Sequence, residues 1–226
     1  MEIMTREEIL KIAKPIFFNT EMVKAILEDR KTVTRRVVKP QILDDGKWGY
    51  TMFTPENHIS FRKSKEAKEW FFKLPYIKGG ILYVRETWMQ LCRVDENGYT
   101  DFDDVMTYYL ADGIPDINLY DYDGFLLDDQ TIKWKPSIHM PKEVARIFLK
   151  VTDIKVERLQ DITIDGVEQE GIPLVYPIID MIDSEHLKKF IAVWNSIIKK
   201  QDLDRCGWEA NPWVWVIEFE RIEVEK

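Results

Sequence analysis

Two long segments in which apolar and polar residues alternate restrict the fold more than any other feature of this sequence. They are RIFLKVTDIKVER, residues 146–158, and PWVWVIEFERIEV, residues 212–224. Alternation with a period of two predicts β-strands that bury one face. A third run, ILYVRETW, follows Gly79-Gly80 and also predicts a strand. The predicted strands are spread along the chain without regular βαβ units, which favours a mixed barrel with peripheral helices over a doubly wound sheet.

Shorter elements lie between these strands. Capping residues and helical spacing predict helices at 5–13, within 21–31 ahead of a turn at 29–32, at 164–169 and from Asp183 or Ser184 to Lys199. Apolar or β-branched runs predict short strands at 14–18 and 32–38, the second of which ends at Pro40. The sequence Glu96-Asn97-Gly98 is typical of a tight turn, and a hairpin is therefore expected over residues 88–111.

The chain is expected to be one α+β domain over residues 1–226. No internal repeat, low-complexity linker or Pro/Gly-rich boundary divides it. Residues 41–77 mix aromatic and charged side chains without a clear period, as expected of an insertion that packs on the core. A second insertion is expected at about 93–133. Both insertions interrupt the predicted barrel.

The net charge of −8 is concentrated in one segment. Residues 101–130 contain nine Asp and no Glu, Lys or Arg, so the rest of the chain is close to neutral. We interpret this acidic segment as a disordered or solvent-facing insertion, and as a possible surface for a protein partner. The overall charge therefore does not exclude nucleic acid as a partner of the remaining chain.

The sequence indicates a cytoplasmic protein without a metal or another cofactor. The N-terminus has no apolar signal region, and no apolar run approaches the roughly 18 residues that a membrane helix needs. Cys92 and Cys206 lie far apart without metal-type spacing, and they are expected to be reduced thiols.

The segment from Arg30 to Arg36 has the highest density of functional groups. It lies where a predicted helix ends and a predicted strand begins, and it carries four cationic side chains and two threonine hydroxyls. Lys31 and Thr34 are three residues apart, so both can reach one pocket. A desolvated lysine has a lower pKa and can act as a base, and a threonine hydroxyl needs such a base to become a nucleophile. The alternative is structural, because the helix dipole favours cations at a helix C-terminus.

Five segments in order resemble the ASCH-domain family, a branch of the PUA-like superfamily. They are NTEMVKAILEDRKTVTRR, KGGILYVRETW, RIFLKVTDIKVERLQDIT, VEQEGIP and WVWVIEFERI, which span residues 19–222. Gly80 stands where the family commonly has an acidic residue. The longer pieces RETW, WKPSIHMP and NPWVWVIEFERI are similar to a group common in bacteriophages and prophages. The resemblance implies a mixed β-barrel of PUA-like type with peripheral helices and two insertions.

The resemblance also implies a site. The family includes small bacterial amidohydrolases that remove the acetyl group from N4-acetylcytidine, and their catalytic Lys-x-x-Thr and Glu match Lys31, Thr34 and Glu170. By this analogy Lys31 activates Thr34, Thr34 attacks the amide carbonyl, and Glu170 transfers a proton or orients the base. The substrate-binding residues expected beside this trio are Arg30, Arg35, Arg36, Trp88 and Trp134.

Two alternatives to the enzyme follow from the same residues. Lysine and arginine also hold phosphate, and Trp88 or Trp134 can stack on a base, so the same residues equally suit a module that binds a modified nucleoside or single-stranded RNA. The third hypothesis is a phage accessory protein that acts through protein contacts, with the acidic segment 101–130 as its interface.

Overall fold

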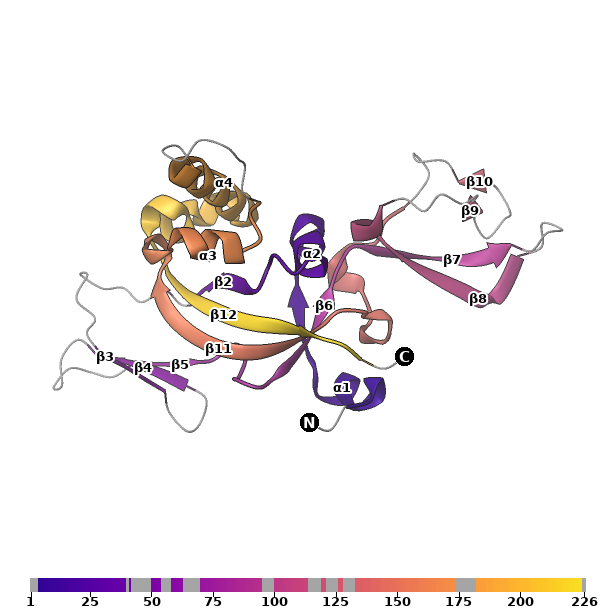
Figure 1. Cartoon of the computed structure of the whole chain (residues 1–226), viewed down its shortest axis with the longest axis horizontal. Coiled ribbons are helices and arrows are strands. Elements are labelled where there is room, and N and C mark those ends of the chain that lie inside the picture. The colour runs from indigo at the N-terminus through magenta and orange to yellow at the C-terminus, as the bar shows by residue number, and fades with distance from the viewer. Residues whose placement is uncertain are drawn as a thin grey trace. The chain divides into compact units, whose positions relative to one another are not determined.

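The computed structural model describes residues 4–39, 41, 50–53, 58–62, 70–94, 100–113, 119–120, 126–127, 133–173 and 182–224. The helices are α1 (Arg6–Ile12), α2 (Thr20–Leu27), α3 (Ile164–Gln169), α4 (Ile182–Ile197) and α5 (Leu203–Cys206). The strands are β1 (Lys14–Phe17), β2 (Val33–Val37), β3 (Tyr50–Phe53), β4 (His58–Arg62), β5 (Trp70–Lys73), β6 (Ile81–Arg85), β7 (Trp88–Val94), β8 (Thr100–Tyr109), β9 (Leu119–Tyr120), β10 (Leu126–Leu127), β11 (Phe148–Arg158) and β12 (Trp213–Ile222) (Figure 1).

The largest sheet has five strands in the order β1-β6-β11-β12-β2. It is mixed, because β1 pairs parallel with β6 whereas β12 pairs antiparallel with β2. The two long strands β11 and β12 are the alternating segments that the sequence indicates, and they are neighbours in the sheet (Figure 1). The α+β class is thus confirmed. In the part of the chain that the structure describes, the strand order is open with β1 and β2 at its ends, and a closed PUA-like barrel stays a prediction.

The two expected insertions contain smaller antiparallel sheets. In the first, β3, β4 and β5 pair in sequence order. The hairpin expected over residues 88–111 is formed by β7 and β8, with a register shift between Cys92 and Arg93, while its predicted turn lies outside the described residues. Strand β8 includes the first nine residues of the acidic segment, so a disordered or loop structure is wrong for that stretch. Its three aspartates lie in the first half of β8, at Asp101, Asp103 and Asp104, and its second half is mostly apolar or aromatic.

Two boundaries differ from the sequence prediction. The run ILYVRETW forms two strands instead of one, because the chain leaves the sheet at Glu86 and Thr87. The backbone N–H of Glu86 donates to the Met140 sulfur there, and the Glu86 carboxylate binds Arg146. Helix α4 begins at Ile182, before both predicted capping residues, and ends before Lys199. Helix ends commonly vary by one or two residues between assignments, so this second difference is small.

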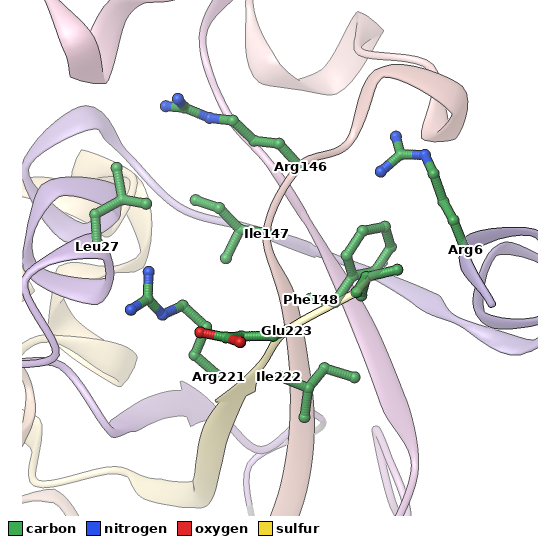
Figure 2. Close-up of a pocket in the computed structure, with 9 residues that line it drawn as sticks. Arg6, Leu27, Arg146, Ile147, Phe148, Arg221, Ile222 and Glu223 are labelled. Atoms are coloured by element: carbon green, nitrogen blue, oxygen red, sulfur yellow. The ribbon is translucent and has the colours of Figure 1, made fainter. Parts of the chain in front are cut away.

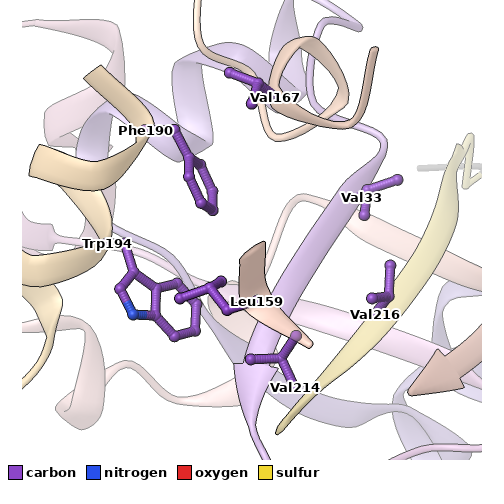
Figure 3. Close-up of a cluster of buried hydrophobic side chains, with 7 residues drawn as sticks. All are labelled: Val33, Leu159, Val167, Phe190, Trp194, Val214 and Val216. Carbon is purple, nitrogen blue, oxygen red and sulfur yellow. The ribbon is translucent and has the colours of Figure 1, made fainter. Parts of the chain in front are cut away.

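Contacts divide the chain into two compact units. One contains residues 1–30, 81–149 and 221–226, and the other contains residues 31–80 and 150–220. The core of the first unit consists of Ile9, Tyr83, Trp88, Met140, Ala145 and Phe148. The core of the second unit consists of Val33, Leu159, Val167, Phe190, Trp194, Val214 and Val216 (Figure 3). The described helices include none that is long and apolar enough to cross a membrane.

Candidate functional site

The cluster around Lys31 lies entirely in the second unit. Lys31 precedes β2, and its backbone pairs with Glu170 in an isolated antiparallel bridge. The next residue, Thr32, donates its N–H to the Gln169 carbonyl and accepts from the Phe219 N–H. These bonds hold the start of β2 between the end of α3 and strand β12. Side chains from residues 31 and 170, distant in sequence, are therefore placed next to each other.

The Lys31 ammonium is buried and has three acceptors. Its side chain is 0% exposed and forms an ion pair of 2.6 Å with Oε2 of Glu170. Nζ also donates to the carbonyl oxygens of Val33 at 2.8 Å and Glu170 at 2.9 Å. An isolated ammonium would be very costly to bury, and these contacts offset that cost. Lys31 and Glu170, which the resemblance implies for one site, thus form a direct ion pair in the structure.

Glu170 is also bound by a second cation, Arg35. The Arg35 Nη1 lies 3.2 Å from Oε1 of Glu170, while its Nε and Nη2 donate to Oε1 of Glu157 at 3.0 and 2.8 Å. Helix α3 can approach this guanidinium because position 166 is glycine: a Cβ there would lie 3.1 Å from Arg35 Nη2. Lys31, Arg35, Glu157 and Glu170 therefore form one continuous network of two cations and two carboxylates.

Thr34 lies on β2, between Val33 and Arg35 in sequence, and is only 2% exposed. Its backbone is opposite Ile217 in the β2–β12 ladder. Among the described residues, no partner donates to or accepts from the Thr34 hydroxyl, and Lys31 Nζ binds the carbonyl of the preceding residue, Val33. The Lys31 amine therefore lies next to the peptide that leads into Thr34.

Arg36 extends the positive charge toward Tyr76. Burial lowers the pKa of the Arg36 guanidinium, although the charges of Tyr76 and Glu170 oppose this effect. Burial also raises the pKa of the Tyr76 phenol, and the charge of Arg36 acts in the opposite direction. Arginine stays protonated in proteins, so Arg36 keeps its positive charge despite its burial. Among the described residues, Arg36 brings the cluster to three cations and two carboxylates, an arrangement that suits an anionic ligand.

The stability of the folded chain is expected to rise with pH where Lys31 loses its proton. Burial disfavours the ammonium and lowers the pKa of Lys31 from its ordinary value of 10.5, although the charge of Glu170 opposes the shift. Just below pH 10.5 the unfolded chain therefore binds more protons at this residue than the folded chain, so the free energy of unfolding increases with pH. Denaturant unfolding of wild type and Lys31→Met between about pH 8 and 10 measures this. If the difference in unfolding free energy between wild type and Lys31→Met does not rise with pH, the lowered pKa of Lys31 is contradicted.

The other predicted substrate-binding residues belong to the first unit. Arg30 is partly exposed and binds Glu28, with Nε 2.7 Å from Oε2. Trp88 is 4% exposed and belongs to the core, and the Lys135 ammonium lies 4.8 Å from its ring centroid. Trp134 is partly buried. These three residues are not part of the network around Lys31, and their predicted role in binding a base stays a prediction.

Sequence reasoning did not identify Glu157 or Tyr76. Glu157 lies near the end of β11, where a charged residue in an alternating strand is normally expected to face solvent. Tyr76 follows β5 in a stretch without a clear period. The only signal for Glu157 is the alternation itself, since the apolar Ile154 and Val156 precede it in the strand.

Comparisons with protein families, curated proteins and solved structures give no match to this chain. In the described part of the chain, no group of three or more His, Cys, Asp or Glu side chains is arranged to hold a metal ion. The chemistry of the Lys31 cluster is therefore considered from its own side chains.

Proposed function

We propose that this chain binds a nucleoside or nucleic acid at the Lys31 cluster and hydrolyses the amide of an N4-acylated cytosine. The observation that carries the proposal is the buried ion pair of Lys31 and Glu170, with the buried Thr34 three residues after Lys31 on β2. This is the set of side chains that the resemblance to ASCH-domain amidohydrolases implies for a catalytic site. Its components are a candidate base, a candidate nucleophile and a carboxylate.

The three side chains support a two-step reaction. Glu170 accepts a proton from Lys31, whose pKa burial lowers, and the neutral amine then accepts the proton of Thr34 as its Oγ attacks the acyl carbonyl carbon. The C–N bond breaks, and the N4 nitrogen takes the proton from Lys31 and leaves as the amino group of cytosine. Water then hydrolyses the threonine ester, which releases the carboxylic acid and restores the hydroxyl. Arg36 supplies positive charge for the developing oxyanion.

A second candidate function is binding without catalysis. Lys31 Nζ donates to Glu170 and Val33, and among the described residues no hydrogen bond joins Nζ to the Thr34 hydroxyl. An ammonium held in this way contributes charge and rigidity more directly than it contributes a base. Together with the excess of positive charge at Arg36, this geometry favours recognition of a nucleotide or single-stranded RNA.

One assay separates the two functions. Purified full-length protein is incubated with N4-acetylcytidine and a series of longer N4-acyl cytidines, and cytidine is measured by chromatography. The amidohydrolase is expected to release cytidine from at least one of them in a saturable manner. If folded protein releases cytidine from none of these N4-acyl cytidines, the proposed amidohydrolase activity is contradicted. Binding of fluorescent single-stranded RNA that weakens steeply with salt would then support the second function.

A further inference from the structure

A cavity of about 620 Å³ lies in the first unit, separate from the residues of the proposed reaction. Its lining residues are Arg6, Leu27, Arg146, Ile147, Phe148, Arg221, Ile222, Glu223 and Val224. They come from the first turn of α1, the end of α2, the start of β11 and the end of β12. The volume is in the range of natural small-molecule sites, which is roughly 300–1,000 Å³.

The lining combines an apolar surface with three guanidinium groups. Figure 2 shows the side chains of Ile147 and Phe148 between the three arginines, with Arg221 and Glu223 near each other. Leu27, Ile222 and Val224 add further apolar area. An apolar lining with a few directed polar groups is the usual composition of a ligand pocket. Only one carboxylate among the lining residues balances the three cations.

The three arginines differ in how far their charge is already neutralised. Arg146 binds the buried Glu86 with two hydrogen bonds of 3.0 and 3.1 Å and contacts Asp112 at 2.6 Å. Arg221 contacts the exposed Asp29 at 3.2 Å. Arg6 has no carboxylate partner among the described residues, since its Nη2 donates to the backbone carbonyls of Glu143 and Ala145. Its positive charge is therefore available to a ligand.

Arg6 is also held in place. The two carbonyl contacts measure 2.9 and 2.6 Å, and the guanidinium lies 5.5 Å from the centroid of the Phe148 ring. A guanidinium that is already oriented loses little rotamer freedom when it binds an anion. We propose that this cavity binds a small organic anion with an apolar body, whose carboxylate or phosphate group pairs with Arg6, whose body lies against the partly exposed Leu27, Ile222 and Val224, and whose charge is further favoured by Arg221 in the lining. This site goes beyond the proposed hydrolysis and does not depend on it.

The first test uses 8-anilinonaphthalene-1-sulfonate, which joins an aromatic body to one anionic group. Fluorescence titration of the full chain is expected to show saturable binding at one site. Arg6→Gln should weaken the binding about tenfold or more, because a charge-assisted hydrogen bond is lost. Glu223→Gln should strengthen it several-fold, because the only carboxylate of the lining becomes neutral. Arg205→Gln, on an exposed arginine of the second unit, is the matched control and should not change it.

The second test separates the two kinds of anion. Indole-3-acetate and cytidine monophosphate are each titrated against bound probe, with tryptamine and cytidine as the counterparts that lack the anion. The proposal is supported if one of the two anions displaces the bound probe and its counterpart without the anion does not. The anion that displaces the probe then shows whether the site takes a carboxylate or a phosphate. Arg221→Gln, whose side chain is partly exposed, replaces Arg6→Gln if thermal melting shows that the latter is unfolded. Absence of saturable binding, or equal affinity in all variants, would overturn the site.

Discussion

Thr34→Val is expected to abolish the release of cytidine from the acylated cytidine that the wild-type protein cleaves, with a loss of at least about a hundredfold. Valine has nearly the same shape as threonine, so β2 keeps its packing and its ladder with β12. The Thr34 hydroxyl has no hydrogen-bond partner among the described residues, and its removal therefore leaves no other group unsatisfied. The variant should unfold at close to the wild-type denaturant concentration. Initial rates and unfolding curves of the same preparation measure both expectations.

Two further variants test whether loss of the Thr34 hydroxyl is the cause of the lost turnover. Thr34→Ser keeps a nucleophile on a smaller side chain and is expected to retain part of the turnover. Thr32→Val removes an exposed hydroxyl two residues earlier, on the same backbone, and is expected to leave turnover unchanged. Wild-type turnover in Thr34→Val would exclude Thr34 as the nucleophile. Water activated directly by the Lys31–Glu170 pair would then be the remaining route to hydrolysis.

The main elements could be predicted from the sequence because their patterns are local. The alternation in residues 146–158 and 212–224 identified β11 and β12, and helical spacing identified α3 at 164–169, which Gly171 follows closely. Gly171 has a φ of 87°, which non-glycine residues adopt only at a cost. The small sheet of β3, β4 and β5 was not predicted, because its strands are four or five residues long and their sequence has no consistent alternation.

The candidate site was predictable only in part, because it depends on contacts between distant residues. Chemistry and spacing singled out Lys31 and Thr34, but only the family resemblance connected them to Glu170. The salt bridge of Arg35 with Glu157 joins residues 122 positions apart, and no local pattern indicates it. The break of ILYVRETW at Glu86 could not be predicted from a local pattern either. A buried carboxylate in a strand-forming run is stable only with a partner such as Arg146, which is distant in sequence.

Glu170→Gln is expected to lower the free energy of unfolding by about 3–5 kcal/mol, the usual cost of removing one partner from a buried ion pair. The Lys31 side chain is 0% exposed, so its ammonium would keep only carbonyl acceptors and an uncharged amide. Arg35 would lose one of its two carboxylates and retain Glu157. Glutamine preserves the volume of glutamate, so the loss reports on charge and not on a cavity. Denaturant unfolding near neutral pH provides the measurement.

An exposed ion pair of the same unit is the control for this substitution. Lys155 on β11 and Glu218 on β12 lie 2.8 Å apart, with side chains 51% and 35% exposed. Solvent screens such a pair, and Glu218→Gln is expected to cost less than about 1 kcal/mol. A loss of similar size for Glu170→Gln would mean that the Lys31 ammonium reaches water in solution, which would contradict the buried site.

The double variant Lys31→Met/Glu170→Gln tests whether the two residues act as one unit. Methionine fills the space of the lysine stem without its charge, so the double variant leaves no unpaired ammonium in the interior. Its loss of stability is expected to be smaller than the sum of the two single losses, by about 1–3 kcal/mol. Additive losses would show that Lys31 is stabilised by the Val33 and Glu170 carbonyls alone. In that case Glu170 would have no special ability to accept a proton from Lys31, and the proton transfer that the proposed reaction requires would lose its structural basis.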